Sequence, residues 1–188
     1  VSEKRNRRVM DITSPQNPRI KHIVKLRDDK KTRNEDGLLL VEGFDEIQLA
    51  LAAGHTPQTL LSAPELASRA LTFSARETLS VSRAVFEKIS HRENPDGWMG
   101  IFPIPQTSLN DLKLSKTPLI IVAESIEKPG NLGAILRTAD AAGVDAVLIP
   151  PETTDPFAPK VVRAGMGAHF HLPILSMGWE EIKRISES

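Results

Sequence analysis

The sequence LIIVAESIEKPGNLGAILRTADAAGVDAVLI, residues 119–149, contains two short apolar runs with a helix-like segment between them. The runs, residues 119–123 and 146–149, are typical of parallel strands that are covered on both faces. Between them, apolar residues recur at helical spacing and predict a buried helix face: Leu132, Ile135, Leu136 and Ala139. The segment therefore predicts a β-α-β unit of an α/β fold with a parallel sheet.

The loop between the first strand and the helix, residues 124–130, is the first candidate site. It follows the carboxyl end of a strand, which is where ligands bind in open parallel sheets. Asn131 is suited to cap the helix. We expect Arg137 to lie off the buried face and to reach back over Ala134 and Gly133 toward the helix start. A guanidinium beside a helix N-terminus favours a phosphate or carboxylate ligand.

A purely structural interpretation of this loop stays open at this point. Gly130 and Gly133 would then serve a tight turn and close packing, and Arg137 would form a surface ion pair. The spacing matches neither the G-x-G-x-x-G fingerprint nor a P-loop, so a dinucleotide site is poorly supported.

The residues before this segment predict a smaller α/β unit. Strands are predicted at residues 38–41, 59–62, 79–81 and 98–102, and helices begin near Asn17, Gly43, Glu65 and Ser82. Residues 103–117 are rich in Pro, Ser, Thr, Asn and Lys, as in a linker. We therefore predict a flexible basic tail at residues 1–10, a first domain at 11–102, a linker at 103–117 and a second domain at 118–188. In the second domain, a helix through Val161 and Val162 leads to a third strand at residues 170–174.

Composition limits the possible functions. The 188 residues are 40% hydrophobic and 26% charged, and no apolar run approaches the roughly 20 residues that span a bilayer. We therefore expect no membrane role. The N-terminus lacks the apolar core of a secretory signal. Without cysteine there is no disulfide, no thiolate chemistry and no Cys-based zinc site.

Positive charge is concentrated near the N-terminus. Residues 1–33 hold eleven Lys or Arg residues and four acids, although the whole chain has no formal net charge. The predicted helix after Asn17 carries four of these cations: Arg19, Lys21, Lys25 and Arg27. Such a face suits nucleic-acid phosphates, because each cation placed at a phosphate releases condensed counterions. The alternative is an ordinary solvated helix face.

Several segments resemble the SpoU (TrmH-type) RNA methyltransferases, a branch of the knotted SPOUT superfamily. NLGAILRTA at residues 131–139, followed by AGVDAV at residues 142–147, is similar to the first motif of that family. KVVRAGMGAHFHLPI at residues 160–174 is similar to its second motif. SPQNPRIK at residues 14–21 and LLVEG at residues 39–43 resemble the substrate-binding domain that many of these enzymes carry.

The resemblance implies a small α/β RNA-binding domain followed by a parallel-sheet SPOUT-type (α/β-knot) methyltransferase domain. It also implies methyl transfer from S-adenosylmethionine to a ribose 2′-hydroxyl of ribosomal or transfer RNA by a cytoplasmic enzyme. Structured RNA would be the partner, and a complete family member would be a homodimer.

The resemblance also implies roles for individual residues. The first-motif arginine, here Arg137, contacts the target nucleotide and activates its hydroxyl, with Asn131 in support. A guanidinium is a poor base, so orienting a phosphate is the safer physical role for Arg137. Arg163 is the candidate for a second phosphate contact. The motif glycines are Gly133, Gly143 and Gly167.

The sequence departs from the family pattern in two places. Gly165 stands where the second motif usually has Ser. The third motif, a Gly-Glu-Gly-Gly-Leu loop and a Ser-Leu-Asn-Val helix, is not found up to Ser188. The resemblance therefore implies a second domain truncated before the knot, with an incomplete S-adenosylmethionine pocket. A second hypothesis is a non-enzymatic RNA-binding protein, and a third is an unrelated α/β nucleotide binder.

Two further pairs of residues could bear chemistry. His169 and His171 are predicted on the same side of a strand, but no third ligand is near them, so we expect no metal site. Glu124 and Glu127 could act as paired carboxylates, but we expect them only to shape the loop.

Overall fold

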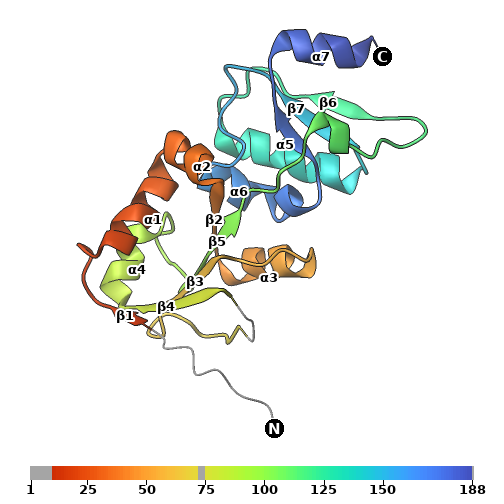
Figure 1. Ribbon diagram of the computed structural model, residues 1–188. Helices are drawn as coiled ribbons and strands as arrows, with labels where there is room; N and C mark the ends of the chain where they lie inside the picture. The colour runs from red at the N-terminus through yellow and green to blue at the C-terminus, as the bar shows by residue number, and fades with distance from the viewer. Residues whose placement is uncertain (1–9, 72–74, 188) are drawn as a thin grey trace.

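The computed structural model describes residues 10–71 and 75–187, which form two α/β units (Figure 1). The predicted flexible tail at residues 1–10 lies outside the described residues, except for Met10, which begins a strand. None of the helices in the described part of the chain is long and apolar enough to cross a membrane.

The first unit is built on a five-stranded sheet. Its elements are β1 (Met10–Ile12), α1 (Pro18–Asp28), α2 (Lys30–Asp36), β2 (Leu38–Glu42), α3 (Phe44–Ala52), β3 (Thr59–Ser62), β4 (Glu77–Val81), α4 (Arg83–Ile89) and β5 (Trp98–Pro103). The strand order is β1-β4-β3-β5-β2. Strands β1, β4 and β3 run parallel, and β5 is antiparallel to both β3 and β2. The predicted strands and the helices that start at Asn17, Gly43 and Ser82 are all confirmed.

Both faces of this sheet are covered, which explains the continuous apolar run in β2. Leu38 and Leu40 point to the face that packs on α1 and α4, whereas Leu39 and Val41 point to the face that packs on α3. Successive side chains of a strand alternate between faces, so a strand covered on both sides buries every residue.

The helix predicted near Glu65 is wrong. The segment makes a single turn, with the N–H groups of Leu66 and Ala67 donating to the Ala63 carbonyl. The indole N–H of Trp98 donates a hydrogen bond to the backbone carbonyl of Arg69 (2.9 Å). The Arg69 guanidinium stacks over the ring of Phe44 in α3. These tertiary contacts replace the hydrogen bonds that a helix would have made.

The second unit has a three-stranded parallel sheet in the order β6-β7-β8, which confirms the predicted β-α-β arrangement. Its elements are the short helix η1 (Leu109–Asp111) in the predicted linker, then β6 (Ile120–Val122), α5 (Pro129–Ala141), β7 (Ala146–Ile149), α6 (Pro159–Gly165), η2 (Ala168–Phe170), β8 (Ile174–Ser176) and α7 (Trp179–Ser186). Helices α5 and α6 cover one face of the sheet. Helix α7 covers the other face.

The third strand of this sheet begins later than predicted. Residues 168–170 form η2, and β8 begins only at Ile174. Gly167 adopts a left-handed conformation (φ 90°), which turns the chain before a strand can form. Phe170 then turns away from the sheet and packs on Phe102 of the first unit, with ring centroids 5.3 Å apart.

The two units share a hydrophobic core where α6 packs against β2. Val162 of α6 and Phe170 of η2 belong to the same buried cluster as Leu39 and Val41 of β2. Figure 1 shows this junction near α2 and α6, between the red-to-green first unit and the green-to-blue second unit. The second unit therefore covers part of the sheet of the first.

A buried ion pair, which the sequence patterns did not predict, joins the units. The guanidinium of Arg33 in α2 donates from Nε (3.0 Å) and Nη2 (2.6 Å) to Asp155, just before α6. Its Nη1 donates to the Leu26 carbonyl (2.7 Å). Arg33 is 3% exposed, so this pair fixes the start of α6 against the first unit.

Candidate functional site

The site is organised by the close crossing of α5 and α6. A Cβ atom placed on Gly133 would lie 2.9 Å from both the Ala164 carbonyl carbon and the Val161 carbonyl oxygen. Gly133 therefore lets the two helices approach more closely than any side chain would allow. Gly133 therefore serves close helix packing and does not, as predicted, make room for Arg137, because α6 occupies the space beside it.

A cleft of about 610 Å³ opens between these helices and the first unit. The second unit contributes Pro129, Gly130, Arg137, Pro159, Lys160, Arg163, Ala164 and Met166, and the first unit contributes Glu42, Glu46 and His91. Residues of both motifs therefore meet in one cavity, together with residues of the first unit.

The cleft contains three unpaired cations. In the part of the chain that the structure describes, no carboxylate lies within 4.0 Å of the charged nitrogens of Arg137, Lys160 or Arg163. Nη1 of Arg137 lies 3.3 Å from the sulfur of Met166. Three cations without acidic partners favour an anionic ligand, and guanidinium groups bind phosphate bidentately.

Met166 follows α6 in a left-handed conformation (φ 46°), which is uncommon for a residue other than glycine. Its side chain is 55% exposed and lines the cleft. Strained residues of this kind are concentrated at functional sites.

The first unit places its own polar groups at the cleft. The buried Glu42 carboxylate accepts a hydrogen bond from the backbone N–H of His91 (3.0 Å). Partial burial lowers the pKa of His91, and the positive charges of Arg27 and Lys160 lower it further. His91 is therefore a neutral hydrogen-bonding group at neutral pH.

Of the two predicted catalytic residues, only Arg137 lines the cleft. Arg137 lies in the cleft beside Pro129 and Gly130, at the helix start, as expected. Asn131 is exposed and does not line this cleft. The prediction that Asn131 caps the helix is wrong, because α5 already begins at Pro129, and its N-cap residue, Lys128, makes no side-chain cap.

The predicted RNA-binding face of α1 is only partly free. Arg19 pairs with Glu77, and Arg27 pairs with Asp28. Lys21 and Lys25 are exposed. None of the four cations lines the cleft, so their role in RNA binding stays a prediction.

The other two motif glycines have structural positions. Gly143 (φ 69°) ends α5 in a left-handed turn. Gly167 lies against Leu49 of α3, and a Cβ atom there would be 2.9 Å from the Leu49 Cβ atom. Gly167 therefore belongs to the contact between the two units.

The two histidines do not lie on one side of a strand, so that prediction is wrong. His169 is buried in η2 and its Nε2 lies 2.7 Å from the Pro156 carbonyl, whereas His171 is exposed. Burial lowers the pKa of His169 to about 4. A Cβ atom on Gly165 would lie 2.8 Å from Nδ1 of His169, so this imidazole occupies the space beside the glycine that replaces the family's usual Ser. Among the described residues no group of three or more His, Cys, Asp or Glu side chains could hold a metal ion.

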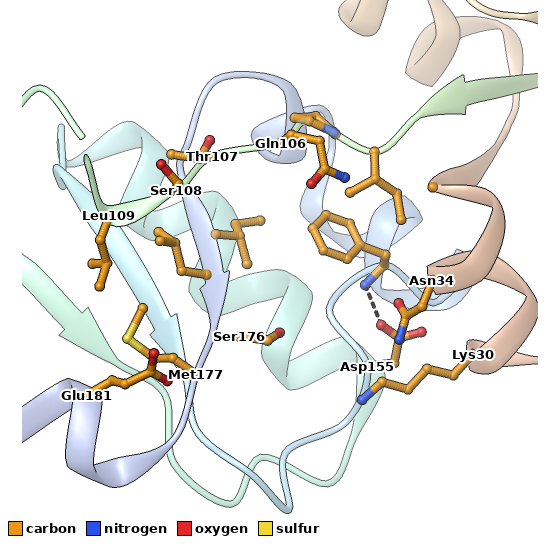
Figure 2. A pocket seen from close by; sticks show the side chains of 16 residues that line it. Lys30, Asn34, Gln106, Thr107, Ser108, Leu109, Asp155, Ser176, Met177 and Glu181 are labelled. Atoms are coloured by element: carbon orange, nitrogen blue, oxygen red, sulfur yellow. Dashed lines mark hydrogen bonds between the residues drawn. The ribbon is translucent and has the colours of Figure 1, made fainter. Parts of the chain in front are cut away.

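A second cavity, of about 550 Å³, lies at the junction between α2 and the carboxyl end of β8. Figure 2 shows Lys30 and Asn34 on one side and Ser176, Met177 and Glu181 on the other. Of the two motifs, only Ile174, the last residue of the second, lines it, and no motif cation does. The cleft at Arg137 is therefore the better candidate for the functional site.

The described residues do not by themselves form a complete pocket for S-adenosylmethionine. Such a pocket needs polar partners for a charged amino-acid group beside an apolar slot. In the loop after β6, Glu124, Ser125 and Glu127 are all exposed. The groove of about 390 Å³ along β6 and α5 is lined mainly by aliphatic side chains such as Leu119 and Ile135. Among the described residues, no buried polar side chain without a partner lies at either place.

Comparison with known proteins assigns both units. Residues 17–100 match the model of the MRM3-like substrate binding domain, and residues 118–186 match that of the SpoU rRNA Methylase family. A crystal structure of an AdoMet-bound rRNA methyltransferase from Sinorhizobium meliloti superposes with a TM-score of 0.82 and 34% identity, over 96% of this chain and 69% of that one.

Two curated relatives are also similar. The mitochondrial rRNA methyltransferase 3 of Mus musculus is 33% identical over 180 residues, which are 92% of this chain and 43% of the relative. The 23S rRNA (guanosine(2553)-2′-O)-methyltransferase of Bacillus subtilis is 29% identical over 164 residues, 87% of this chain and 64% of the relative. The chain thus spans about two fifths of the length of the mitochondrial relative.

Proposed function

The chain belongs to the SpoU rRNA methylase family, and we propose that the protein transfers a methyl group from S-adenosylmethionine to a ribose 2′-hydroxyl of ribosomal RNA. The observation that carries this proposal is the cleft in which Arg137, Lys160 and Arg163 lie without acidic partners. The cleft joins both family motifs to the substrate-binding unit, so an RNA strand held by that unit reaches the motif residues. The 2′-O specificity named for the Bacillus subtilis relative supports the choice of the ribose.

Arg137 has a positioning role in this proposal. A guanidinium stays charged in proteins and is therefore a poor base. A guanidinium held in a cleft can instead fix the phosphate next to the target ribose, and correct placement of the reacting hydroxyl supplies much of the rate. Lys160 and Arg163 lie on the neighbouring helix and supply further phosphate contacts. Asn131, which lies outside the cleft, keeps a supporting role only as a proposal.

The partner in this proposal is structured ribosomal RNA in the compartment where ribosomes mature, which is the cytoplasm in a bacterium. We also propose a homodimer, as the family resemblance implies. The edge strand β6 has partly exposed apolar residues, with Val122 41% exposed and Leu119, just before the strand, 53% exposed, which supports a further packing partner there.

A methyl-transfer assay tests the proposed function. The whole protein is incubated with tritium-labelled S-adenosylmethionine and unmodified ribosomal RNA, and label in the RNA is counted. We expect Arg137→Ala to lower the rate at least about a hundredfold. Arg137→Lys should keep part of the activity, because it retains the charge, and its pH–rate profile should follow the wild type. Arg83→Ala is the matched control, because Arg83 is an exposed arginine paired with Glu87 on α4.

Two results would count against the proposal. RNA binding without any methyl transfer would favour the non-enzymatic RNA-binding hypothesis. A pH–rate profile that shifts in Arg137→Lys would show that Arg137 exchanges a proton in the reaction and does more than hold a phosphate.

A further inference from the structure

The loop between α4 and β5, residues 90–96, forms a second chamber beside the cleft. This chamber, of about 400 Å³, is lined by His91, Arg92, Glu93, Asn94 and Arg163. It shares His91 and Arg163 with the cleft of about 610 Å³. The two spaces therefore adjoin at Arg163, and both volumes lie in the range that holds small ligands.

The α4–β5 loop is held in a fixed conformation by the first unit. The buried Glu42 carboxylate accepts hydrogen bonds from the Ser90 hydroxyl and from the His91 backbone N–H. The Arg92 guanidinium donates to the Glu42 carbonyl (2.7 Å) and pairs with Glu46 of α3. A loop fixed by charge-assisted hydrogen bonds presents its remaining side chains in a defined arrangement.

The exposed side chains of this loop have the chemistry to read a nucleobase. The Arg92 guanidinium is held by the Glu42 carbonyl and by the carboxylates of Glu46 and Asp96. His91, Glu93 and Asn94 are exposed. The Asn94 amide offers both a donor and an acceptor, the pattern used to recognise the edge of a base. Arg163 lies between the cleft and the second chamber and has no carboxylate partner among the described residues. Its guanidinium is therefore free to bind the phosphate that links two nucleotides.

We propose that the second chamber binds the nucleotide adjacent to the methylated one. Arg163 holds the connecting phosphodiester, and Asn94, with His91 and Glu93 beside it, reads the edge of the flanking base. The inference rests on the proposed function, because it takes the cleft at Arg137 as the site of the target nucleotide. It identifies the α4–β5 loop as a determinant of sequence specificity, and both bases must be unstacked to enter their chambers.

Short RNA probes test this inference on the whole protein. The ligands are uridine 3′,5′-bisphosphate and four trinucleotides that have a central uridine between two identical bases. Isotope-labelled protein reports binding through its backbone amide signals. The bisphosphate should shift signals of α5, α6 and the shared His91, and the trinucleotides should also shift those of residues 92–96. In the wild type, the tightest and weakest trinucleotides should differ at least about fivefold in Kd.

The variants isolate the role of Asn94. Asn94→Ala should bring the four trinucleotides to within about twofold of one another and leave the Kd of the bisphosphate unchanged. Asn94→Asp, which keeps the shape but adds negative charge, should weaken every trinucleotide. Asn34→Ala is the matched control, because Asn34 is an exposed asparagine that lines the other cavity.

The outcomes separate the two proposals. Shifts in α5 and α6 without shifts in residues 92–96, or a base preference that survives Asn94→Ala, would overturn the flanking-base chamber and leave the proposed function intact. If no probe shifts α5 or α6, the cleft does not bind nucleotides, and both proposals fail.

Discussion

At the scale of single residues, the site is defined by which charges are satisfied within the protein. Arg33 has its guanidinium committed to Asp155 and to a backbone carbonyl, so it is a structural cation. Arg137 and Lys160 have no acidic partner among the described residues and line a cleft. The same residue types therefore serve stability in one place and ligand binding in the other, according to their neighbours.

The buried His169 should make the stability of the folded protein depend on pH. Its folded-state pKa is lowered to about 4 by burial, against 6.5 for an unperturbed histidine. As the pH falls from 6.5 to 4, the unfolded chain takes up a proton that the folded chain cannot, so folded-state stability is lost in this window. We expect this histidine to account for roughly 3 kcal/mol of that loss.

Urea denaturation at pH 7 and pH 4 checks this expectation. His169→Gln removes the titrating group. Between pH 7 and pH 4 its free energy of unfolding should fall by roughly 3 kcal/mol less than that of the wild type. His22→Gln, which changes an exposed imidazole on the first unit, is the matched control. Equal losses in the wild type and His169→Gln would show that His169 is not the buried neutral group described here.

Sequence patterns identified Arg137 as a site residue, but they did not predict the capping residue of α5 or the burial of Arg33. Arg137 was placed by its motif and by helical spacing, and the structure puts it in the cleft. Asn131 suits a cap by residue type, but Pro129, a residue favoured at the first helical position, already starts α5. The burial of Arg33 was not predictable, because its partner Asp155 is 122 residues away in the sequence.

At the scale of secondary-structure elements, the crossing of α5 and α6 shapes the cleft. Gly133 sets the distance between the two helices, and Gly130 lies one turn earlier on the same helix, with no heavy atom within 4 Å of a Cβ atom placed there. Comparing an alanine substitution at Gly133 with one at Gly130 therefore separates the effect of close packing from that of helix propensity.

Gly133→Ala should lower the free energy of unfolding by about 1–2 kcal/mol. The methyl group would press on Ala164 and the backbone of α6, which costs about 1–3 kcal/mol, and helix propensity recovers up to about 1 kcal/mol. Gly130→Ala should be neutral or stabilising by up to about 1 kcal/mol. Urea denaturation measures both variants, and a stabilising Gly133→Ala would show that the helices are not in close contact.

Elements with a strong local pattern were predicted well. Apolar runs predicted β2 and β7. The N-cap residues Asn17 and Ser82 predicted the starts of α1 and α4. The helix near Glu65 and the early start of the third strand were wrong, because tertiary contacts of Arg69 and Phe170 decide those segments. Local propensity carries no information on such contacts.

At the scale of the whole molecule, the two units share one core. Val162 and Phe170 pack into the apolar cluster on β2, and the Arg33–Asp155 pair closes over the junction. The hydrophobic pattern of each half indicated an α/β unit. The packing of one unit on the sheet of the other depends on contacts that this pattern does not contain. This junction also forms one wall of the cleft.

Arg33→Met should therefore destabilise the molecule and uncouple its halves. Leaving the buried Asp155 carboxylate without its partner should cost about 3–5 kcal/mol, whereas Arg83→Met, at an exposed pair, should cost less than about 1 kcal/mol. Trp98 and Trp179 report on the first and second units. In variants that keep only one tryptophan, Trp98 and Trp179 should report the same urea midpoint in the wild-type background. With Arg33→Met, the two midpoints should differ. Coincident transitions in both backgrounds would contradict this role of the ion pair.

The most direct test of the proposed activity is the chemical identity of the product. Ribosomal RNA methylated by the whole protein with labelled S-adenosylmethionine is hydrolysed with alkali and separated by size. A methyl group on a ribose 2′-oxygen blocks attack on the neighbouring phosphate, so the label should be found in an alkali-stable dinucleotide. Label in mononucleotides would mean that a base is methylated, and this would contradict the account of the cleft as a ribose 2′-O-methylation site.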